Sequence, residues 1–221
     1  MISYMNKVFC QIQDAKIIPV IKLEKEELSI PLIDTITGVG LSCPEITFRT
    51  PCASSCIKKI KEFNKNITVG AGTINTIEDA KKALDSGADY LVSPGSFEPL
   101  LDWCSKNSVP FIPGVATPTE IQKALYFGYN LLKFFPAEAC GGTKMIKALS
   151  APFGQVSFIP TGGINQENAK DYLSIKSVFA LGGSWMVPTD LINQQDWLSI
   201  KKLCEKVIFM IPSKQKGKNE K

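Results

Sequence analysis

Residues 90–134 read YLVSPGSFEPLLDWCSKNSVPFIPGVATPTEIQKALYFGYNLLKF, and the spacing of their apolar residues predicts the class of fold. Short apolar runs at residues 90–92, 109–112 and 130–134 are separated by longer amphipathic segments. The short runs predict strands, and the segments between them predict helices. Strands that alternate with helices in this way are typical of a parallel sheet whose crossovers are helical.

The same unit repeats about every 20 to 25 residues along the chain, so the sequence predicts an α/β fold. Eight units favour closure into one (β/α)8 TIM barrel over an open sheet. Residues 1–15 predict an extra N-terminal helix, and residues 191–210 predict the last helix. The predicted strands are 17–21, a strand that includes 45–47, and 67–71, 90–92, 109–112, 130–134, 157–159 and 178–181. The predicted helices between them are 24–37, 52–63, 77–86, 99–106, 119–127, 143–150 and 166–173.

Length and composition favour one domain at residues 1–212, followed by a lysine-rich tail at residues 213–221 that we expect to be disordered. Hydrophobic residues make up 44% of the 221 residues, enough for a substantial core. No apolar run reaches the roughly 18 residues that span a bilayer, and the N-terminus lacks the pattern of a secretory signal. The net charge of +4 comes from scattered residues. We therefore expect a cytoplasmic protein without nucleic-acid or membrane partners.

The chain has no histidine, which excludes Ser-His and Cys-His catalytic pairs and removes the commonest metal ligand. Its seven cysteines show no paired C-x-x-C spacing. We expect them to be free thiols rather than a zinc site or a disulfide framework. Any catalysis therefore depends on lysine, carboxylates or a cofactor.

In barrels of parallel strands the functional residues lie at the carboxyl ends of the strands. The sixth predicted strand ends with Lys133 and Phe135, which alternate onto the same face as Leu131. If this face is the interior, burial favours the neutral lysine amine that condenses with a ketone. A lysine that reaches from the strand end to water explains the same residues.

The second and third predicted strands carry further polar residues. Glu45 and Arg49 are four residues apart, so an extended strand points both side chains to one face. Either Glu45 relays protons and Arg49 binds a substrate carboxylate, or the two residues form a simple ion pair. Arg49 is the one arginine of the chain, and arginine binds planar carboxylates at two points. Thr73 follows Gly72 at the end of the third strand, as a ligand-binding hydroxyl or as the cap of a tight turn.

Glycine pairs follow the last two predicted strands, at residues 162–163 and 182–183. Backbone N–H groups of such turns converge on an anion, and barrels commonly bind phosphate after these two strands. Turns with a purely structural role also use glycine.

Seven short motifs together resemble the family of 2-keto-3-deoxy-6-phosphogluconate (KDPG) aldolase, which includes 4-hydroxy-2-oxoglutarate aldolase. The similarity covers roughly residues 17–190, in the order and with the spacing of the family. The motifs are EITFRT at 45–50, VGAGT at 69–73, SPG at 93–95, IPG at 112–114, KFFPAE at 133–138, PTGGI at 160–164 and GGSW at 182–185.

The resemblance implies a class I (Schiff-base) aldolase that needs no metal or cofactor and forms a homotrimer. It would cleave KDPG to pyruvate and glyceraldehyde 3-phosphate, and also 4-hydroxy-2-oxoglutarate to pyruvate and glyoxylate. Lys133 would form the imine and Glu45 would act as general acid and base. The other implied roles are carboxylate binding by Arg49 and Thr73, phosphate binding by Thr161, Gly162, Gly163, Gly183 and Ser184, and shaping of the pocket by Pro94 and Phe135.

Two positions depart from the family pattern. Pro44 falls in the middle of the second predicted strand, where proline cannot donate to the sheet. Cys140 replaces an expected asparagine before Gly141. The alternative substrate is the C4-epimeric 2-keto-3-deoxy-6-phosphogalactonate. The alternative functions are a phosphosugar isomerase, a divalent-metal aldolase and a non-catalytic phosphate-ligand-binding barrel.

Overall fold

A computed structural model describes residues 2–211 of the chain, so the predicted tail at residues 213–221 lies outside the described residues. All paired strands run parallel, in a six-stranded sheet of order β5-β4-β3-β2-β1-β9 and a three-stranded sheet of order β6-β7-β8. The prediction of an α/β fold with parallel strands is confirmed. The strands are β1 (Ile17–Ile21), β2 (Glu45–Thr47), β3 (Gly70–Gly72), β4 (Tyr90–Val92), β5 (Phe111–Ile112), β6 (Gly114–Val115), β7 (Leu131–Phe134), β8 (Ser157–Pro160) and β9 (Leu181–Gly183).

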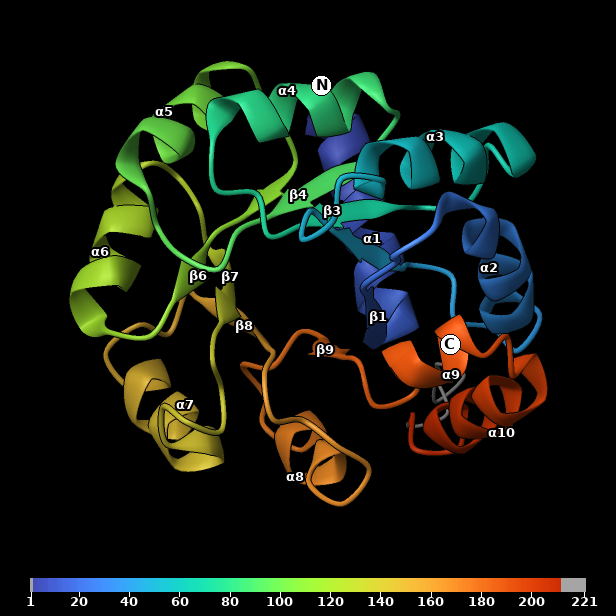
Figure 1. Cartoon of the computed structure of the whole chain (residues 1–221). Helices are drawn as coiled ribbons and strands as arrows, with labels where there is room; N and C mark the ends of the chain where they lie inside the picture. Colours follow the sequence, from blue (N-terminus) through green and yellow to red (C-terminus); the bar gives the residue numbers. More distant parts are fainter. Residues whose placement is uncertain (1, 212–221) are drawn as a thin grey trace, which may run out of the picture.

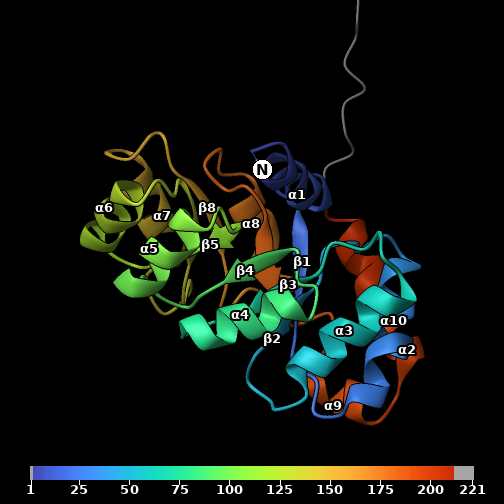
Figure 2. The ribbon, with the colours of Figure 1, turned by 90° about the horizontal axis from the view of Figure 1, so that it is seen from above.

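Helices surround the strands, as Figure 1 shows. Figure 2, turned by 90°, shows α1 lying across the end at which β1 begins. Among the described helices, none is both long and apolar enough to span a bilayer. The helices are α1 (Ile2–Ala15), the 3-10 helix η1 (Glu26–Leu28), α2 (Ser29–Thr37), α3 (Ala53–Phe63), α4 (Ile77–Asp85), α5 (Glu98–Lys106), α6 (Pro118–Tyr126), α7 (Gly142–Ser150), α8 (Ala169–Leu173), α9 (Thr189–Asn193) and α10 (Trp197–Ile208).

Pro113 divides one strand position into β5 and β6. Because proline has no N–H, it cannot donate to a neighbouring strand. β5 pairs with β4 and β6 pairs with β7, while the carbonyl of Pro113 accepts a hydrogen bond of 2.9 Å from the N–H of Lys133. At the other edge of the smaller sheet, the bridges Phe158–Val178 and Thr161–Gly182 link β8 to the segment that forms β9.

Side-chain alternation along each strand separates an inner cluster from outer clusters. In β7, Leu131 belongs to the inner cluster, and Leu132 packs in an outer cluster under the helices. Helix α1 adds Val8 and Ile12 to the inner cluster. Residues that alternate with the same phase as Leu131 therefore point inward, which fixes the side of the sheet on which polar residues of the strands lie.

Two predicted helices are each divided in the structure. The helix predicted at residues 24–37 becomes η1 and α2, with Pro31 in the first turn of α2, where its missing N–H leaves no hydrogen bond unmade. The helix predicted at residues 191–210 becomes α9 and α10. Asp196 caps α10 by accepting the N–H of Ser199 at 3.0 Å, so the second helix starts anew.

The prediction that Pro44 lies in the middle of the second strand is wrong. Pro44 directly precedes β2, which begins at Glu45. Its carbonyl accepts a hydrogen bond of 2.8 Å from the N–H of Gly70. In this bond proline is the acceptor, so its missing N–H does not matter. The strand therefore keeps an unbroken register with β3 from Glu45 to Thr47.

We predict that Leu132→Ala lowers the free energy of unfolding by about 2–5 kcal/mol, because Leu132 is fully buried and its truncation leaves a cavity. The matched control is Leu198→Ala in α10, whose side chain is 64% exposed, with an expected change within about 0.5 kcal/mol. Urea unfolding followed by circular dichroism measures both. Equal losses would contradict the assignment of Leu132 to the core.

Candidate active site

The side chains of Lys133 and Glu45 meet on the inner face of the strands. The Nζ atom of Lys133 lies 3.3 Å from Oε1 of Glu45, and the two side chains are 7% and 3% exposed. Lys133 is two residues after the inward-facing Leu131, so its inward direction follows from strand alternation. The structure therefore excludes a lysine that reaches back to water, and it pairs Glu45 with Lys133 instead of Arg49.

Strand register and one glycine set the position of this pair. Lys133 lies opposite Gly114 of β6, and Glu45 lies opposite Gly70 of β3. At Gly72, an added Cβ atom would lie 1.9 Å from Oε1 of Glu45. Any larger residue there would collide with the carboxylate, so the glycine of the VGAGT motif leaves the space that Glu45 occupies.

Phe135 borders the lysine. The Nζ atom of Lys133 lies 5.4 Å from the centroid of the Phe135 ring, within the range of a cation–π contact. The same ring packs against Gly162, where an added Cβ would lie 3.2 Å from Cε2 of Phe135. Phe135 thus connects the lysine with the first glycine pair.

Arg49 and Thr73 follow β2 and β3 but lie outside them. β2 ends at Thr47, so Arg49 is in the following turn and its side chain is exposed. The prediction that an extended strand carries both Glu45 and Arg49 is therefore wrong. Thr73 is half-buried and has a φ angle of +60°, a conformation that β-branched residues rarely adopt.

The two glycine pairs lie side by side, but only the first forms a turn. Gly162 and Gly163 have φ angles of +97° and +79°, which favour glycine. Gly182 and Gly183 are residues of β9, so the prediction of a second Gly-Gly turn is wrong. Glycine is needed there for close packing, because a Cβ on Gly182 would lie 2.3 Å from Oγ1 of Thr161.

The other predicted site residues also follow strand ends. Pro94 comes after β4, and its carbonyl oxygen would lie 2.2 Å from a Cβ on Gly114, the residue that pairs with Lys133. Thr161 is buried directly after β8, and Ser184 is exposed directly after β9. The predicted site residues outside the strands thus follow the carboxyl ends of β2, β3, β4, β7, β8 and β9.

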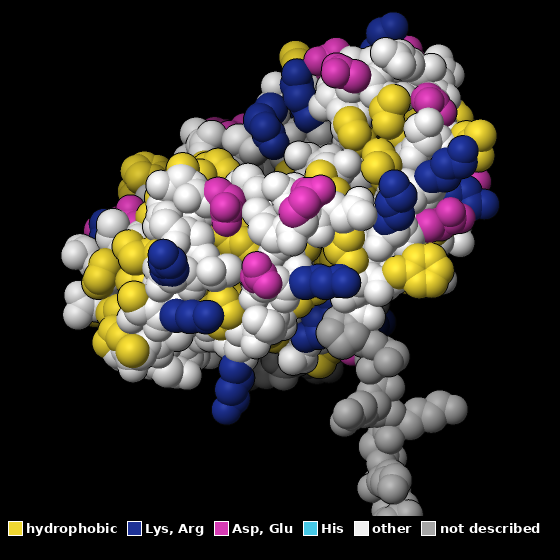
Figure 3. Space-filling model, turned by 90° about the horizontal axis from the view of Figure 1, so that it is seen from below, with side chains coloured by type: hydrophobic (Ala, Val, Ile, Leu, Met, Phe, Trp, Pro, Cys, Tyr) yellow, Lys and Arg dark blue, Asp and Glu magenta, His cyan; other side chains and the backbone are white. Residues whose placement is uncertain are grey.

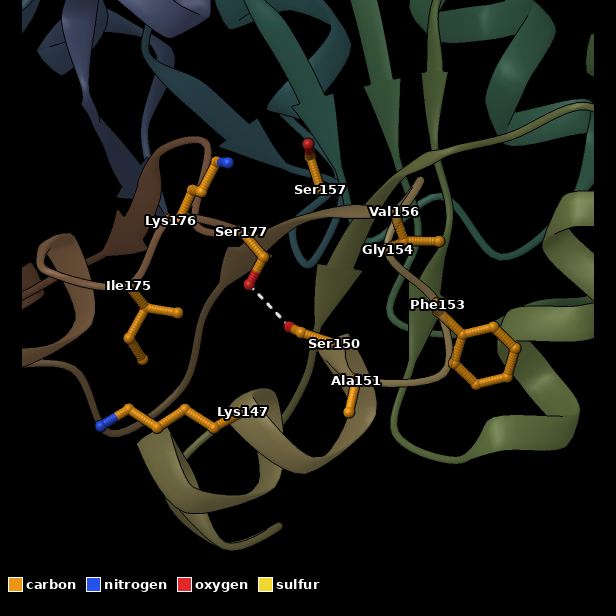
Figure 4. Close-up of a pocket in the computed structure, with 10 residues that line it drawn as sticks. All are labelled: Lys147, Ser150, Ala151, Phe153, Gly154, Val156, Ser157, Ile175, Lys176 and Ser177. Atoms are coloured by element: carbon orange, nitrogen blue, oxygen red, sulfur yellow. Dashed lines mark hydrogen bonds between the residues drawn. The ribbon is translucent and has the colours of Figure 1, made fainter.

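Two cavities lie elsewhere, at the amino ends of the strands. One of about 540 Å³ is lined by Lys147, Ser150, Lys176 and Ser177, with a hydrogen bond of 2.7 Å between the two serines (Figure 4). Another of about 330 Å³ lies between α1 and the ends of α5 and α6. Neither cavity includes Lys133 or Glu45.

Basic side chains do not gather into one patch on the face in Figure 3, where they are interspersed with acidic and hydrophobic ones. This distribution agrees with the scattered lysines of the sequence and differs from the continuous basic surface typical of nucleic-acid-binding proteins.

Comparison with known proteins gives consistent matches over nearly the whole chain. A family model described as "Aldolase: KDPG and KHG aldolase" matches residues 8–203. The chain is 40% identical to the 2-dehydro-3-deoxy-phosphogluconate aldolase of Treponema pallidum, over 94% of this chain and 99% of that one. The corresponding enzyme of Haemophilus influenzae is 42% identical, over 93% and 97% of the two chains.

A solved structure shows the same arrangement of the backbone. The KDPG aldolase of Legionella pneumophila, with pyruvate captured as a covalent carbinolamine intermediate, superimposes with a TM-score of 0.87. It is 38% identical and covers 92% of this chain and 97% of its own. The family match and these relatives show that the chain belongs to the KDPG and KHG aldolase family.

Proposed function

We propose that this protein is a Schiff-base aldolase that cleaves KDPG to pyruvate and glyceraldehyde 3-phosphate, and 4-hydroxy-2-oxoglutarate to pyruvate and glyoxylate. The observation that carries the proposal is the buried pair of Lys133 and Glu45, with 3.3 Å between amine nitrogen and carboxylate oxygen. An amine and a general acid or base within hydrogen-bond reach are what imine formation requires. The carbinolamine captured in the Legionella pneumophila relative supports the same chemistry.

The reaction begins when Glu45 takes a proton from the Lys133 ammonium. The neutral amine attacks the C2 carbonyl of the keto acid and forms a carbinolamine. Glu45 then returns a proton to the C2 hydroxyl, which leaves as water, and an iminium ion remains. Since one carboxylate both accepts and donates protons in these steps, it must stay within reach of the reacting nitrogen.

Carbon–carbon cleavage follows from the iminium ion. Glu45, again a carboxylate, takes the proton from the C4 hydroxyl, so the C3–C4 electron pair moves into the iminium and that bond breaks. Glyceraldehyde 3-phosphate leaves and an enamine of pyruvate remains on Lys133. Glu45 returns this proton to C3 of the enamine, and addition of water to the resulting imine releases pyruvate and regenerates the amine.

We assign substrate binding to the residues around the strand ends. Arg49, the one arginine of the chain, would bind the carboxylate at two points, and Thr73 would donate its hydroxyl. The N–H groups of the turn at Gly162 and Gly163 would bind the distal phosphate. The phosphate lies far from the breaking bond, so its binding energy orients the substrate. Further phosphate ligands would be Thr161, Gly183 and Ser184, and Pro94 and Phe135 would shape the pocket.

We infer that the eight strand positions close into a (β/α)8 barrel of one domain, residues 1–212, with α1 as its extra N-terminal helix. The inference is supported by the continuity of β5 and β6 across Pro113 and by the two bridges between β8 and the β9 segment. By family resemblance we also propose a homotrimer that acts in the cytoplasm, and light scattering of the purified protein tests the trimer.

The competing functions differ in their substrates and cofactors. A divalent-metal aldolase needs metal ligands, yet the chain has no histidine, and no group of three or more acidic, cysteine or histidine side chains among residues 2–211 is arranged to hold a metal ion. The functions of a phosphosugar isomerase or of a non-catalytic phosphate-binding barrel do not explain why a lysine is buried beside a carboxylate. Cleavage of the C4 epimer is distinguished from cleavage of KDPG by direct assay of both substrates.

We predict that the protein releases pyruvate fastest from KDPG, more slowly from 4-hydroxy-2-oxoglutarate and from the C4 epimer, and that a chelator leaves these rates unchanged. Coupling to lactate dehydrogenase measures the pyruvate.

Lys133→Ala removes the amine that forms the imine, so kcat should fall at least about 1,000-fold. Fastest cleavage of the epimer, or turnover that survives Lys133→Ala, would contradict the proposal.

We predict that Gly72→Ala lowers kcat about 100-fold, because the added methyl group displaces the general acid and base from the lysine. Gly154→Ala is the matched control, since an added Cβ there meets no atom within 4 Å. Both kcat values are measured on protein whose folding has been checked by circular dichroism. A folded Gly72→Ala enzyme with undiminished kcat would show that the position of Glu45 does not matter.

A further inference from the structure

We propose that Glu138 and Tyr172 are positioning residues, which fix the Gly162–Gly163 turn for the substrate phosphate without taking part in the imine chemistry. The inference rests on the proposed function, because it concerns the phosphate-binding turn of that site. Neither residue was assigned a role from the sequence, where they are 34 positions apart.

A hydrogen bond joins the two side chains, since the Tyr172 hydroxyl donates to Oε1 of Glu138. Tyr172 is fully buried in α8, and Glu138 lies in the loop between β7 and α7, shortly after Lys133. Burial raises the pKa of Tyr172, and the bond to Glu138 raises it further. The phenol therefore stays protonated and remains a hydrogen-bond donor over the working range of the enzyme.

The side chain of Glu138 also packs directly against the turn. A Cβ on Gly163 would lie 2.6 Å from Cβ and 2.7 Å from Cγ of Glu138, so the glutamate fills the space beside this glycine. The backbone of Glu138 also contacts the turn, because its N–H donates to the carbonyl of Gly162 at 3.1 Å. The N–H of Ala137 donates to the carbonyl of Thr161 at 2.8 Å.

Helix α8 holds the other side of the turn. Asn168, at the start of α8, donates its side-chain amide to the carbonyl of Gly163 at 3.0 Å. Tyr172, on the same helix, holds Glu138. The turn is thus fixed between the loop after β7 and the helix after β8, and the hydrogen bond from Tyr172 to Glu138 connects these two supports.

The supports of the phosphate-binding turn differ from those of the reacting pair. The Gly162–Gly163 turn carries the backbone N–H groups proposed to bind phosphate, whereas Lys133 and Glu45 are fixed by β7, β2 and Gly72. Loosening the turn should weaken binding of a phosphorylated substrate and leave imine formation with pyruvate intact. The proposal therefore predicts a change in KM that a general loss of stability would not produce, because KM does not depend on the fraction of enzyme that is folded.

The test compares two activities of each variant, the cleavage of KDPG and the exchange of pyruvate methyl protons with deuterated water, followed by NMR. Exchange requires the imine and enamine but no phosphate site. Tyr172→Phe should raise KM for KDPG about tenfold, the usual effect of one lost hydrogen bond to a charged group, and leave exchange within twofold of wild type. Glu138→Ala should do the same, and the double variant should be no worse than either single variant.

Two further variants distinguish the hydrogen bond from other effects. Glu138→Gln keeps an acceptor oxygen and should recover most of the KM. Tyr129→Phe is the matched control, because it removes a tyrosine hydroxyl that donates to the carbonyl of Leu101 at 3.0 Å, and KM should not change.

Unchanged KM in Tyr172→Phe, an equal loss of exchange and cleavage, or a Glu138→Gln enzyme as impaired as Glu138→Ala would overturn the inference. A wild-type protein that exchanges pyruvate protons and cleaves KDPG, combined with any of these results, would leave the proposed function standing. A wild-type protein with neither activity would overturn the proposed function and this inference with it.

Discussion

The buried contact between Lys133 and Glu45 is the interaction on which the rest of the site depends. Two ionisable groups with side chains 7% and 3% exposed have lost most of their hydration, and only their mutual attraction and nearby dipoles offset that loss. Removing either partner would leave the other uncompensated. The short distance that costs free energy of hydration also lets a proton pass between carboxylate and amine, which is the first requirement of imine formation.

Close packing at the carboxyl ends of the strands keeps this pair in place. Gly72 leaves space for the Glu45 carboxylate, and Gly182 leaves space for Thr161, so two strands approach their neighbours more closely than a side chain would allow. Polar groups of widely separated segments thereby reach one end of the fold, while α1 and the inner apolar cluster fill the opposite end. Stability and catalysis are thus assigned to opposite ends of the same strands, as in other folds of this architecture.

Local patterns predicted most of the strands and placed Lys133 on the same strand face as Leu131, because alternation and strand ends depend on neighbouring residues alone. They left open whether that face is the interior, which the packing of Leu131 settles. The errors have physical causes. Pro44 directly precedes β2, a position at which the missing N–H of proline is tolerated. Gly182 and Gly183 stay within β9, where the absence of a Cβ atom on Gly182 lets Thr161 pack against the strand. The contact of Tyr172 with Glu138 left no pattern in the sequence, since it joins residues 34 positions apart that only the tertiary fold brings together.

Reductive trapping tests most directly whether the amine of Lys133 condenses with a keto acid. The protein is incubated with pyruvate and sodium borohydride, and the site of the added mass is located by mass spectrometry of its peptides. The account predicts one stable pyruvate adduct on Lys133, formed with loss of activity and absent from Lys133→Ala. No adduct, or an adduct on a different lysine with Lys133 unmodified, would contradict it.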